Sequence, residues 1–209
     1  MSKLISILYF LITLSSFSQG FEGLINYKIT HTSLDSSTNE IAAMPTKLDF
    51  YISGELARID QSTKIGTQTT IIDTLLKRNI LLINLMDKKF GIILDGNDTS
   101  DVENIIYSEE SEDFLGIECK KAIINSINKK TKKSTTSTIY YTNKIDNSYN
   151  INFKKLKGFP IYYEIISNNI ISTYLAVEMT KKNIDPKIFE IDNKTSIYKM
   201  EDFRALMTQ

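Results

Sequence analysis

Apolar and polar residues alternate with a period of two along most of this chain. Ile25, Tyr27 and Ile29 alternate with polar neighbours, and residues 48–52 repeat the pattern. Because successive side chains of a β-strand point to opposite faces, this period predicts strands that bury one face. Apolar residues at helical spacing are few, so the sequence predicts a mainly β protein with minor α content.

The alternating runs predict the strands and one clear hairpin. Further strands are expected at residues 58–60, 67–73, 79–86, 89–94, 103–107, 118–128 and 135–142. The hairpin joins residues 159–166 to residues 170–180 through Ser167-Asn168-Asn169. Asn tolerates the left-handed backbone of tight turns, so the paired asparagines predict this turn. In the second arm we expect unbroken alternation, with Val177 and Met179 on the same face.

Helical signals are confined to short segments. They are a capped stretch at residues 146–156, a single turn opened by Asp185-Pro186, and the tail at residues 200–207. Asp146 is placed to cap the first helix, which carries Tyr149, Phe153 and Leu156 at helical spacing. We therefore expect a single antiparallel, strongly curved sheet with one or two short helices against it.

Two of the expected strands, at residues 80–85 and 91–94, are apolar on both faces. A sheet with one wet face alternates apolar and polar residues, so here the second face must be covered as well. Two accounts stay open. The protein's own helices cover that face, or the curved sheet encloses an apolar cavity that holds a ligand.

The beginning of the chain is typical of a secretory leader. Lys3 precedes an apolar run at residues 4–14, and small polar residues follow it. A run of about eleven residues is too short to cross a bilayer as a helix, which needs roughly twenty. We expect a signal peptide at residues 1–19, cleaved near Ser18 or Gln19, and a single mainly β domain at residues 20–209. The predicted location is periplasmic or secreted.

Charge and cysteine content exclude several classes of protein. The chain has 25 Lys and Arg residues against 25 Asp and Glu residues. This balance argues against a nucleic-acid partner and against a polybasic membrane anchor. No second apolar run is long enough for a transmembrane segment in the mature chain. Cys119 is the only cysteine, so it makes no internal disulfide, and it lies too far from the leader to carry a lipid anchor.

Motifs that would indicate catalysis or metal binding are missing from the sequence. His31 is the only histidine, which leaves no histidine cluster for a metal or a triad, and we expect it to be a plain surface residue. Cys119 is expected to be a small buried apolar residue. The acidic run at residues 109–113 and the lysine-rich stretch at 128–134 are typical of solvated surface. We assign no catalytic, cofactor-binding or metal-binding residue, and an enzyme is the third hypothesis.

Several pieces of the sequence, taken in order, resemble a known family. They are Phe21-Glu22-Gly23-x-Ile25-x-Tyr27, Ile52-Ser53-Gly54, Arg58-Ile59-Asp60, Leu85-Met86-Asp87-Lys88-Lys89-Phe90, Gly116-x-x-Cys119-Lys120-Lys121-Ala122 and Leu156-Lys157-Gly158-Phe159-Pro160-Ile161. This order resembles exported Bacteroidota proteins of unknown function, the GLPGLI family and its close domain-of-unknown-function relatives. The last piece lacks the second glycine of the name-giving motif, which favours the relatives.

The resemblance implies a mainly β periplasmic protein, similar in shape to the half-open barrels of lipoprotein carriers. It brings no activity and no catalytic residue to this chain. Our leading hypothesis is a non-enzymatic binding or carrier module for an apolar ligand such as a lipid. The alternative is a structural or protein-interaction component of the cell envelope, which meets another protein through a sheet edge or through a face bearing Tyr162 and Tyr174.

Overall fold

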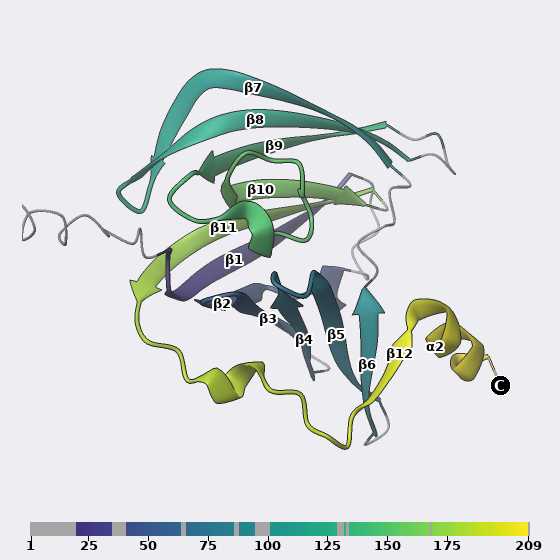
Figure 1. Ribbon diagram of the computed structural model, residues 1–209. Coiled ribbons are helices and arrows are strands. Elements are labelled where there is room, and N and C mark those ends of the chain that lie inside the picture. Colours follow the sequence, from purple (N-terminus) through teal and green to yellow (C-terminus); the bar gives the residue numbers. More distant parts are fainter. Residues whose placement is uncertain are drawn as a thin grey trace, which may run out of the picture.

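The structure, a computed structural model, describes residues 20–34, 41–63, 66–85, 88–94, 101–128, 132, 134–167 and 169–208. The predicted signal peptide lies outside these residues, as does most of the lysine-rich stretch. Within the described chain, twelve strands form one sheet, with one α-helix and three short 3₁₀ helices (Figure 1). None of the described helices has the length and apolar character needed to span a membrane.

The strands follow the chain in two groups. The first group is β1 (Gly23–Ser33), β2 (Lys47–Ser53), β3 (Leu56–Thr63), β4 (Gly66–Asp73), β5 (Arg78–Leu85) and β6 (Lys88–Leu94). The second is β7 (Asp101–Phe114), β8 (Ile117–Asn128), β9 (Ser134–Thr142), β10 (Phe159–Ser167), β11 (Ile170–Lys181) and β12 (Ser196–Lys199). All the strands expected from the period of two are present; β12 was not expected.

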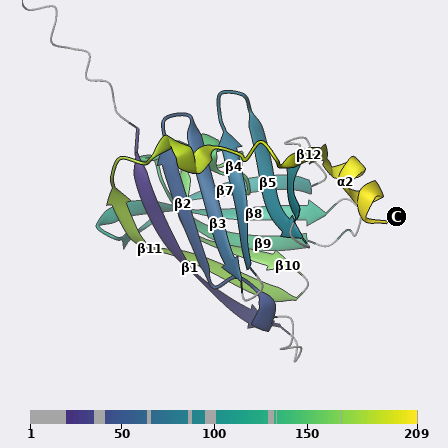
Figure 2. The same ribbon diagram turned by 90° about the horizontal axis from the view of Figure 1, so that it is seen from below.

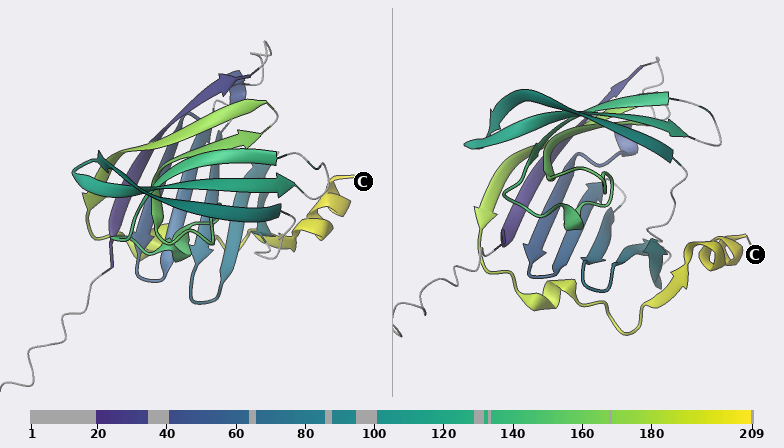
Figure 3. Two further views of the ribbon diagram at one scale, coloured as in Figure 1. Left: turned by 90° about the horizontal axis from the view of Figure 1, so that it is seen from above. Right: turned by 45° about the horizontal axis from the view of Figure 1, so that its top comes forward.

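The sheet is continuous but does not close on itself. Its order is β12-β6-β5-β4-β3-β2-β1-β11-β10-β9-β8-β7, so β12 and β7 are free edges. Pairing is antiparallel throughout except between β12 and β6, which run parallel. The pairing of β1 with β11 joins the two groups, and the sheet curves so that its halves face each other (Figure 3). The prediction of a mainly β fold with a half-open, curved sheet is confirmed.

The hairpin between β10 and β11 forms at the expected place, and one detail of its second arm differs. Asn169 has a φ of 61°, the left-handed conformation for which asparagine was predicted. A β-bulge then breaks the alternation, because Tyr27 of β1 pairs with Ala176 while the preceding Asn26 pairs with Glu178. Val177 is the extra residue and faces solvent, so the expectation that it shares a face with Met179 is wrong.

The hydrophobic core lies on the concave face of the sheet. Every second residue of the central strands is buried there, in the set Ile25, Tyr27, Ile29, Leu48, Phe50, Ile52, Ile139, Tyr141, Phe159, Ile161 and Tyr163. Residues 143–158, which connect β9 to β10, contribute Ile145, Phe153 and Leu156 to the same core. This covering loop lies between the two halves of the sheet (Figures 1 and 3).

The covering loop contains only one turn of helix, η2 (Asn147–Tyr149). Asp146 does cap it by accepting a hydrogen bond from the Ser148 amide. The predicted α-helix over residues 146–156 is wrong, because asparagine side chains take over the hydrogen bonds of the local backbone. Asn150 Oδ1 accepts from the amides of Asn152 and Phe153, an alternative to helical bonding that this side chain offers readily.

The outer face of strands β3 to β6 is covered by the C-terminal segment, which crosses it in Figure 2. The predicted turn at Asp185-Pro186 is confirmed as the 3₁₀ helix η3 (Pro186–Phe189). Arg58 Nη1 donates to the Ile188 carbonyl over 2.6 Å and fastens this segment to β3. Ile71 and Ile80 are buried on this outer face. The chain itself therefore covers part of the second face, at Ile71 and Ile80.

The predicted C-terminal helix is confirmed as α2 (Met200–Met207), and it packs against β12 and β6 at one end of the sheet. Phe203 contacts the ring of Phe90 edge-on, with ring centroids 5.6 Å apart, and also lies beside Tyr198 of β12. Met207, at the end of this helix, remains half exposed. A third short helix, η1 (Ile41–Ala43), precedes β2.

Gly158 closes the covering loop against the end of β9, and this contact yields a stability prediction. A Cβ at this position would lie 2.5 Å from the Thr142 carbonyl oxygen and 2.6 Å from Asn143 Oδ1. Gly158→Ala should therefore destabilise the protein by about 1–3 kcal/mol, the cost typical of overpacking. Gly20→Ala, where no atom lies within 4 Å, is the matched control and should change nothing. Urea unfolding midpoints that are equal for the two variants would contradict this packing.

Candidate ligand-binding site

A cavity of about 230 Å³ lies on the concave face beneath the covering loop. We call it the inner cavity. Its described lining consists of Tyr27, Leu48, Phe50, Ile59, Gln61, Thr70, Asn150, Ile151, Asn152, Phe159, Pro160, Tyr163, Ile165 and Tyr174. These residues come from strands β1, β2, β3, β4, β10 and β11 and from the covering loop. No carboxylate, amine, imidazole or thiol is among them.

Aromatic rings form much of the wall of the inner cavity. Tyr163 stacks on Tyr174 with ring centroids 4.5 Å apart, and it meets Tyr27 edge-on at 6.1 Å. Phe50 and Phe159 make a second edge-to-face pair at 5.2 Å. Such pairs hold rings in fixed orientations, so the wall is rigid and presents ring faces and edges to the cavity.

The polar atoms in this wall are already bonded to the protein. The Tyr27 hydroxyl donates to the Pro160 carbonyl over 2.7 Å, Tyr163 hydrogen-bonds with Asn152, and Tyr174 hydrogen-bonds with Gln61. Within the described chain, no buried side-chain nitrogen or oxygen lacks a partner. An apolar group that contacts the three tyrosines therefore leaves their hydroxyls satisfied. Burial raises the pKa of Tyr27 and of Tyr163 far above that of a free tyrosine, so both stay neutral.

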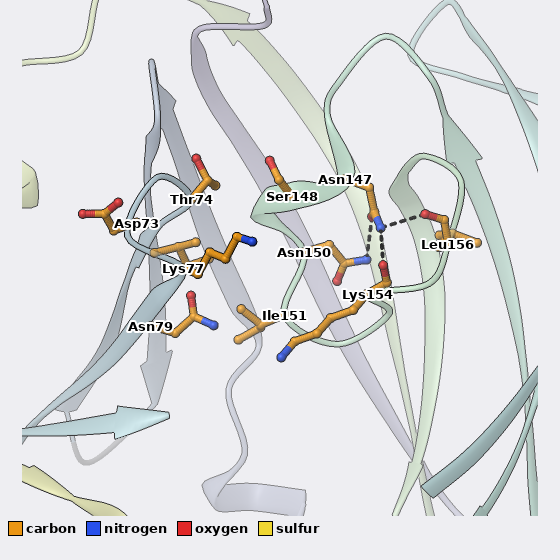
Figure 4. Close-up of a pocket in the computed structure, with 11 residues that line it drawn as sticks. Asp73, Thr74, Lys77, Asn79, Asn147, Ser148, Asn150, Ile151, Lys154 and Leu156 are labelled. Atoms are coloured by element: carbon orange, nitrogen blue, oxygen red, sulfur yellow. Dashed lines mark hydrogen bonds between the residues drawn. The ribbon is translucent and has the colours of Figure 1, made fainter. Parts of the chain in front are cut away.

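A second cavity, of about 660 Å³, adjoins the first on its β4–β5 side. We call it the outer cavity, and Figure 4 shows it. It is lined by Ile72, Asp73, Thr74, Lys77, Asn79, Asn147, Ser148, Asn150, Ile151, Lys154 and Leu156. Asn150 and Ile151 of the covering loop line both cavities. Aromatic and aliphatic side chains form most of the wall of the inner cavity, together with the polar residues Gln61, Thr70, Asn150 and Asn152. The outer cavity also has amines and a carboxylate in its lining.

The covering loop is held in place mainly by its own asparagines. Asn147 Nδ2 donates to the carbonyls of Phe153 and Leu156, at 3.1 and 2.8 Å, and its Oδ1 accepts from Asn150. Three phenolic hydrogen bonds tie the loop to the sheet: the Tyr149 hydroxyl donates to the Gly54 carbonyl, the Tyr107 hydroxyl of β7 donates to the Lys155 carbonyl, and Tyr163 of β10 bonds with Asn152. Most of the hydrogen bonds of the described loop are nevertheless internal to it.

The structure corrects the expected tyrosine face. Tyr174 lies on the concave face, stacked on Tyr163, whereas the neighbouring Tyr162 points to the convex face. There Tyr162 packs with Phe114 and Tyr140, at centroid distances of 6.0 and 5.8 Å. Successive residues of a strand face opposite sides, and the register pairs Tyr174 with Tyr163 and not with Tyr162. Tyr162 and Tyr174 therefore do not share a surface.

His31 and Cys119 are the single histidine and the single cysteine of the chain. His31 is not a plain surface residue, because it is partly buried and both ring nitrogens are bonded, one to Ser172 Oγ at 2.9 Å and one to the Pro45 carbonyl at 2.7 Å. It links β1 to β11 and to the segment before β2. Cys119 is fully buried as expected, and burial raises the pKa of its thiol to about 11, so the reactive thiolate is disfavoured.

The described residues contain no candidate metal site, and comparison with known proteins identifies no relative of the chain. No group of three or more His, Cys, Asp or Glu side chains in the described ranges is placed to hold a metal ion. No protein-family model matches the chain, and no curated protein matches its sequence. The candidate site therefore rests on the two cavities and their lining. Sequence patterns did not identify it; the cluster of asparagines at residues 147–152 was the one available signal.

Tyr27 links stability to pH at the alkaline end. Its folded-state pKa is raised above 10.0, so above pH 10 the unfolded chain loses this proton while the folded one keeps it. The free energy of unfolding should then fall by about 1.4 kcal/mol per pH unit from this group. Tyr27→Phe, which leaves the Pro160 carbonyl unpaired, should cost about 1–3 kcal/mol at pH 7.

Tyr27→Phe lacks the ionisable hydroxyl. The difference in free energy of unfolding between the wild-type protein and this variant should therefore shrink above pH 10, by about 1.4 kcal/mol at pH 11. Urea unfolding of both proteins between pH 7 and pH 11 measures this difference. Stability curves that run parallel over that range would show that Tyr27 ionises as readily in the folded state as in the unfolded state.

Asn147 provides a test of how the covering loop is held. Asn147→Ala removes the hydrogen bonds of Asn147 Nδ2 to the carbonyls of Phe153, Lys154 and Leu156. The free energy needed to open the loop should then fall by about 1–2 kcal/mol. The amides of Asn150 and Leu156, bonded within the loop to the carbonyls of Asn147 and Phe153, should then exchange hydrogen at least several-fold faster. Ser148→Ala is the control. If the strand amides accelerate as much as the loop amides, the loop is not a separate unit.

Proposed function

We propose that this protein is a non-enzymatic binding or carrier module for an apolar ligand such as a lipid, acting in the periplasm or outside the cell. The observation that carries the proposal is the ring-lined inner cavity under a loop on an unclosed sheet. The described residues that line it include no carboxylate, amine, imidazole or thiol, which supports binding over catalysis. The predicted leader and the resemblance to exported proteins support the location.

The size of the inner cavity favours a ligand that is only partly enclosed. Sites for small molecules typically have volumes of roughly 300–1,000 Å³, and the inner cavity alone is smaller. A longer apolar chain therefore needs either the adjoining outer cavity or the space that Phe153 and Leu156 of the covering loop now fill. Both residues are apolar and buried, so an acyl chain that displaced them would replace their contacts with similar ones.

The rim of the outer cavity also supports a lipid ligand. The β4–β5 hairpin ends in Leu75 and Leu76, whose exposed fractions are 74% and 62%, next to Lys77. Exposed leucine side chains at a hairpin tip are not stabilised by water. Beside a binding site, such side chains are typical of surfaces that contact an apolar partner. A ligand taken from a lipid layer would reach the cavities past this tip.

Tryptophan variants offer a direct test because the chain contains no tryptophan. Ile165 lines the inner cavity, and Ile166, the next residue of β10, points to the convex face. We expect a fatty alcohol brominated on its chain, which is a neutral quencher, to quench the emission of Ile165→Trp with saturation at one equivalent. The emission of Ile166→Trp should stay unchanged. Equal quenching of both variants, or none at all, contradicts a ligand site on the concave face.

A second candidate function has one specific observation in its favour. Phe114, Tyr140 and Tyr162 form a partly exposed aromatic cluster on the convex face, and such clusters are common where proteins meet. This supports an envelope component that binds another protein. The same variants separate the two functions, because a protein on the convex face would shield the tryptophan of Ile166→Trp and leave that of Ile165→Trp unaffected.

A further inference from the structure

The turn between β4 and β5 carries the two most exposed large apolar side chains of the described chain. Leu75 and Leu76 have exposed fractions of 74% and 62%, and no other large apolar side chain in the described ranges is more than 60% exposed. The two leucines are adjacent, and the turn that bears them projects beyond the neighbouring β2–β3 turn (Figure 2). Single exposed apolar residues are normal on a protein surface, whereas an adjacent pair at a projecting tip is typical of a contact surface.

Hydrogen bonds at the base of this turn fix its backbone. Asp73 Oδ1 accepts from the Leu76 amide over 2.8 Å, and the amide and the hydroxyl of Thr74 donate to the Glu55 carbonyl at 3.0 and 2.9 Å. Lys77, which closes the turn, adopts the left-handed conformation with a φ of 50°. Backbone groups that enter an apolar medium must be satisfied within the protein, so these bonds favour insertion of the tip into such a medium.

A basic side chain lies on each side of this tip. Lys77 lines the outer cavity on the concave side (Figure 4), and Arg78 lines a cavity on the outer face, beside the C-terminal segment. Neither forms an ion pair within the described chain. The acids of the turn, Asp73 and Glu55, are bonded at its base. Long basic side chains can keep their charge in water or at lipid headgroups while the apolar residues beside them enter lipid.

The size and shape of this surface favour a lipid bilayer over a protein partner. A stable protein interface buries roughly 800 Å² on each partner. Two leucines at a narrow tip provide far less apolar surface, and the residues next to them in the chain are polar or charged. A bilayer admits a projecting tip without a matching pocket, and lipid headgroups also attract the flanking cations.

We propose that the β4–β5 turn docks this protein on a lipid bilayer. Leu75 and Leu76 enter the acyl-chain layer, and the two basic residues beside them remain at the lipid headgroups. The outer cavity, which is lined in part by residues of the same turn, then lies next to the lipid surface. The inference goes beyond the proposed function, because the turn can dock whether or not either cavity holds a ligand.

Tryptophan at the tip reports insertion directly, because the natural chain contains no tryptophan. With vesicles of phosphatidylcholine and phosphatidylglycerol, the emission of Leu75→Trp should shift to shorter wavelength, and lipids brominated on their acyl chains should quench it. Leu34→Trp is the matched control. Leu34 is 60% exposed and follows β1 at the opposite end of the sheet, so emission from this position should stay unchanged.

A double variant measures what the two leucines contribute to vesicle binding. Leu75→Ser, Leu76→Ser should bind the same vesicles about tenfold more weakly in co-sedimentation, since the two apolar side chains are then missing from the lipid contact. Leu34→Ser should bind as the wild-type protein does. All these proteins share the same N-terminal segment, so any contribution of the predicted leader is common to them.

Three results would overturn the docking proposal. They are a wild-type protein that does not bind the vesicles, equal responses of Leu75→Trp and Leu34→Trp, and a double variant that keeps full affinity. A dimer that depends on the two leucines, seen by sedimentation velocity in the absence of vesicle binding, would identify a second copy of the chain as the partner. None of these results decides the ligand site, which the quenching of Ile165→Trp tests separately.

Discussion

A sheet that curves without closing must find cover for its concave face, and the rest of this structure depends on how that cover is made. The central strands bury aromatic and aliphatic side chains on that face, and the edges β7 and β12 do not meet. Water on such a surface would cost roughly 25 cal/mol for each Å² of apolar area. The chain covers it with residues 143–158, and what this loop leaves unfilled is the candidate site.

The way in which residues 143–158 cover the concave face is compatible with the proposed binding and release of a ligand. A second sheet or a long helix would bury this face permanently, whereas the covering loop is bonded mainly to itself through Asn147 and Asn150. Its attachment to the core is apolar, through Ile145, Phe153 and Leu156. An acyl chain offers the same kind of contact, so loop and ligand can compete for one surface. By contrast, the outer-face cover is fastened by Arg58, whose side chain also holds Asp60 at 2.9 Å.

Much of the fold is predictable from the sequence because its information is local. The alternation with a period of two located the strands. The paired asparagines predicted the turn between β10 and β11, where Asn169 adopts the left-handed conformation. The bulge at Val177 and the partners of Tyr162 and Tyr174 depend on strand register, which a single sequence does not define. The candidate site was also not predictable, since the residues that line the two cavities come together only when residues 143–158 fold over the sheet. The helix expected at residues 146–156 failed because asparagine hydrogen bonds, which helical spacing ignores, dominate there.

Native mass spectrometry of the protein purified from the envelope of its own host tests the central claim most directly. We expect a complex of one chain with one acyl compound. The complex should lose its ligand when the covering loop is opened by mild denaturant. A protein that is recovered empty, and that takes up no acyl compound when lipids are added back, would contradict the claim that its concave face is a binding site.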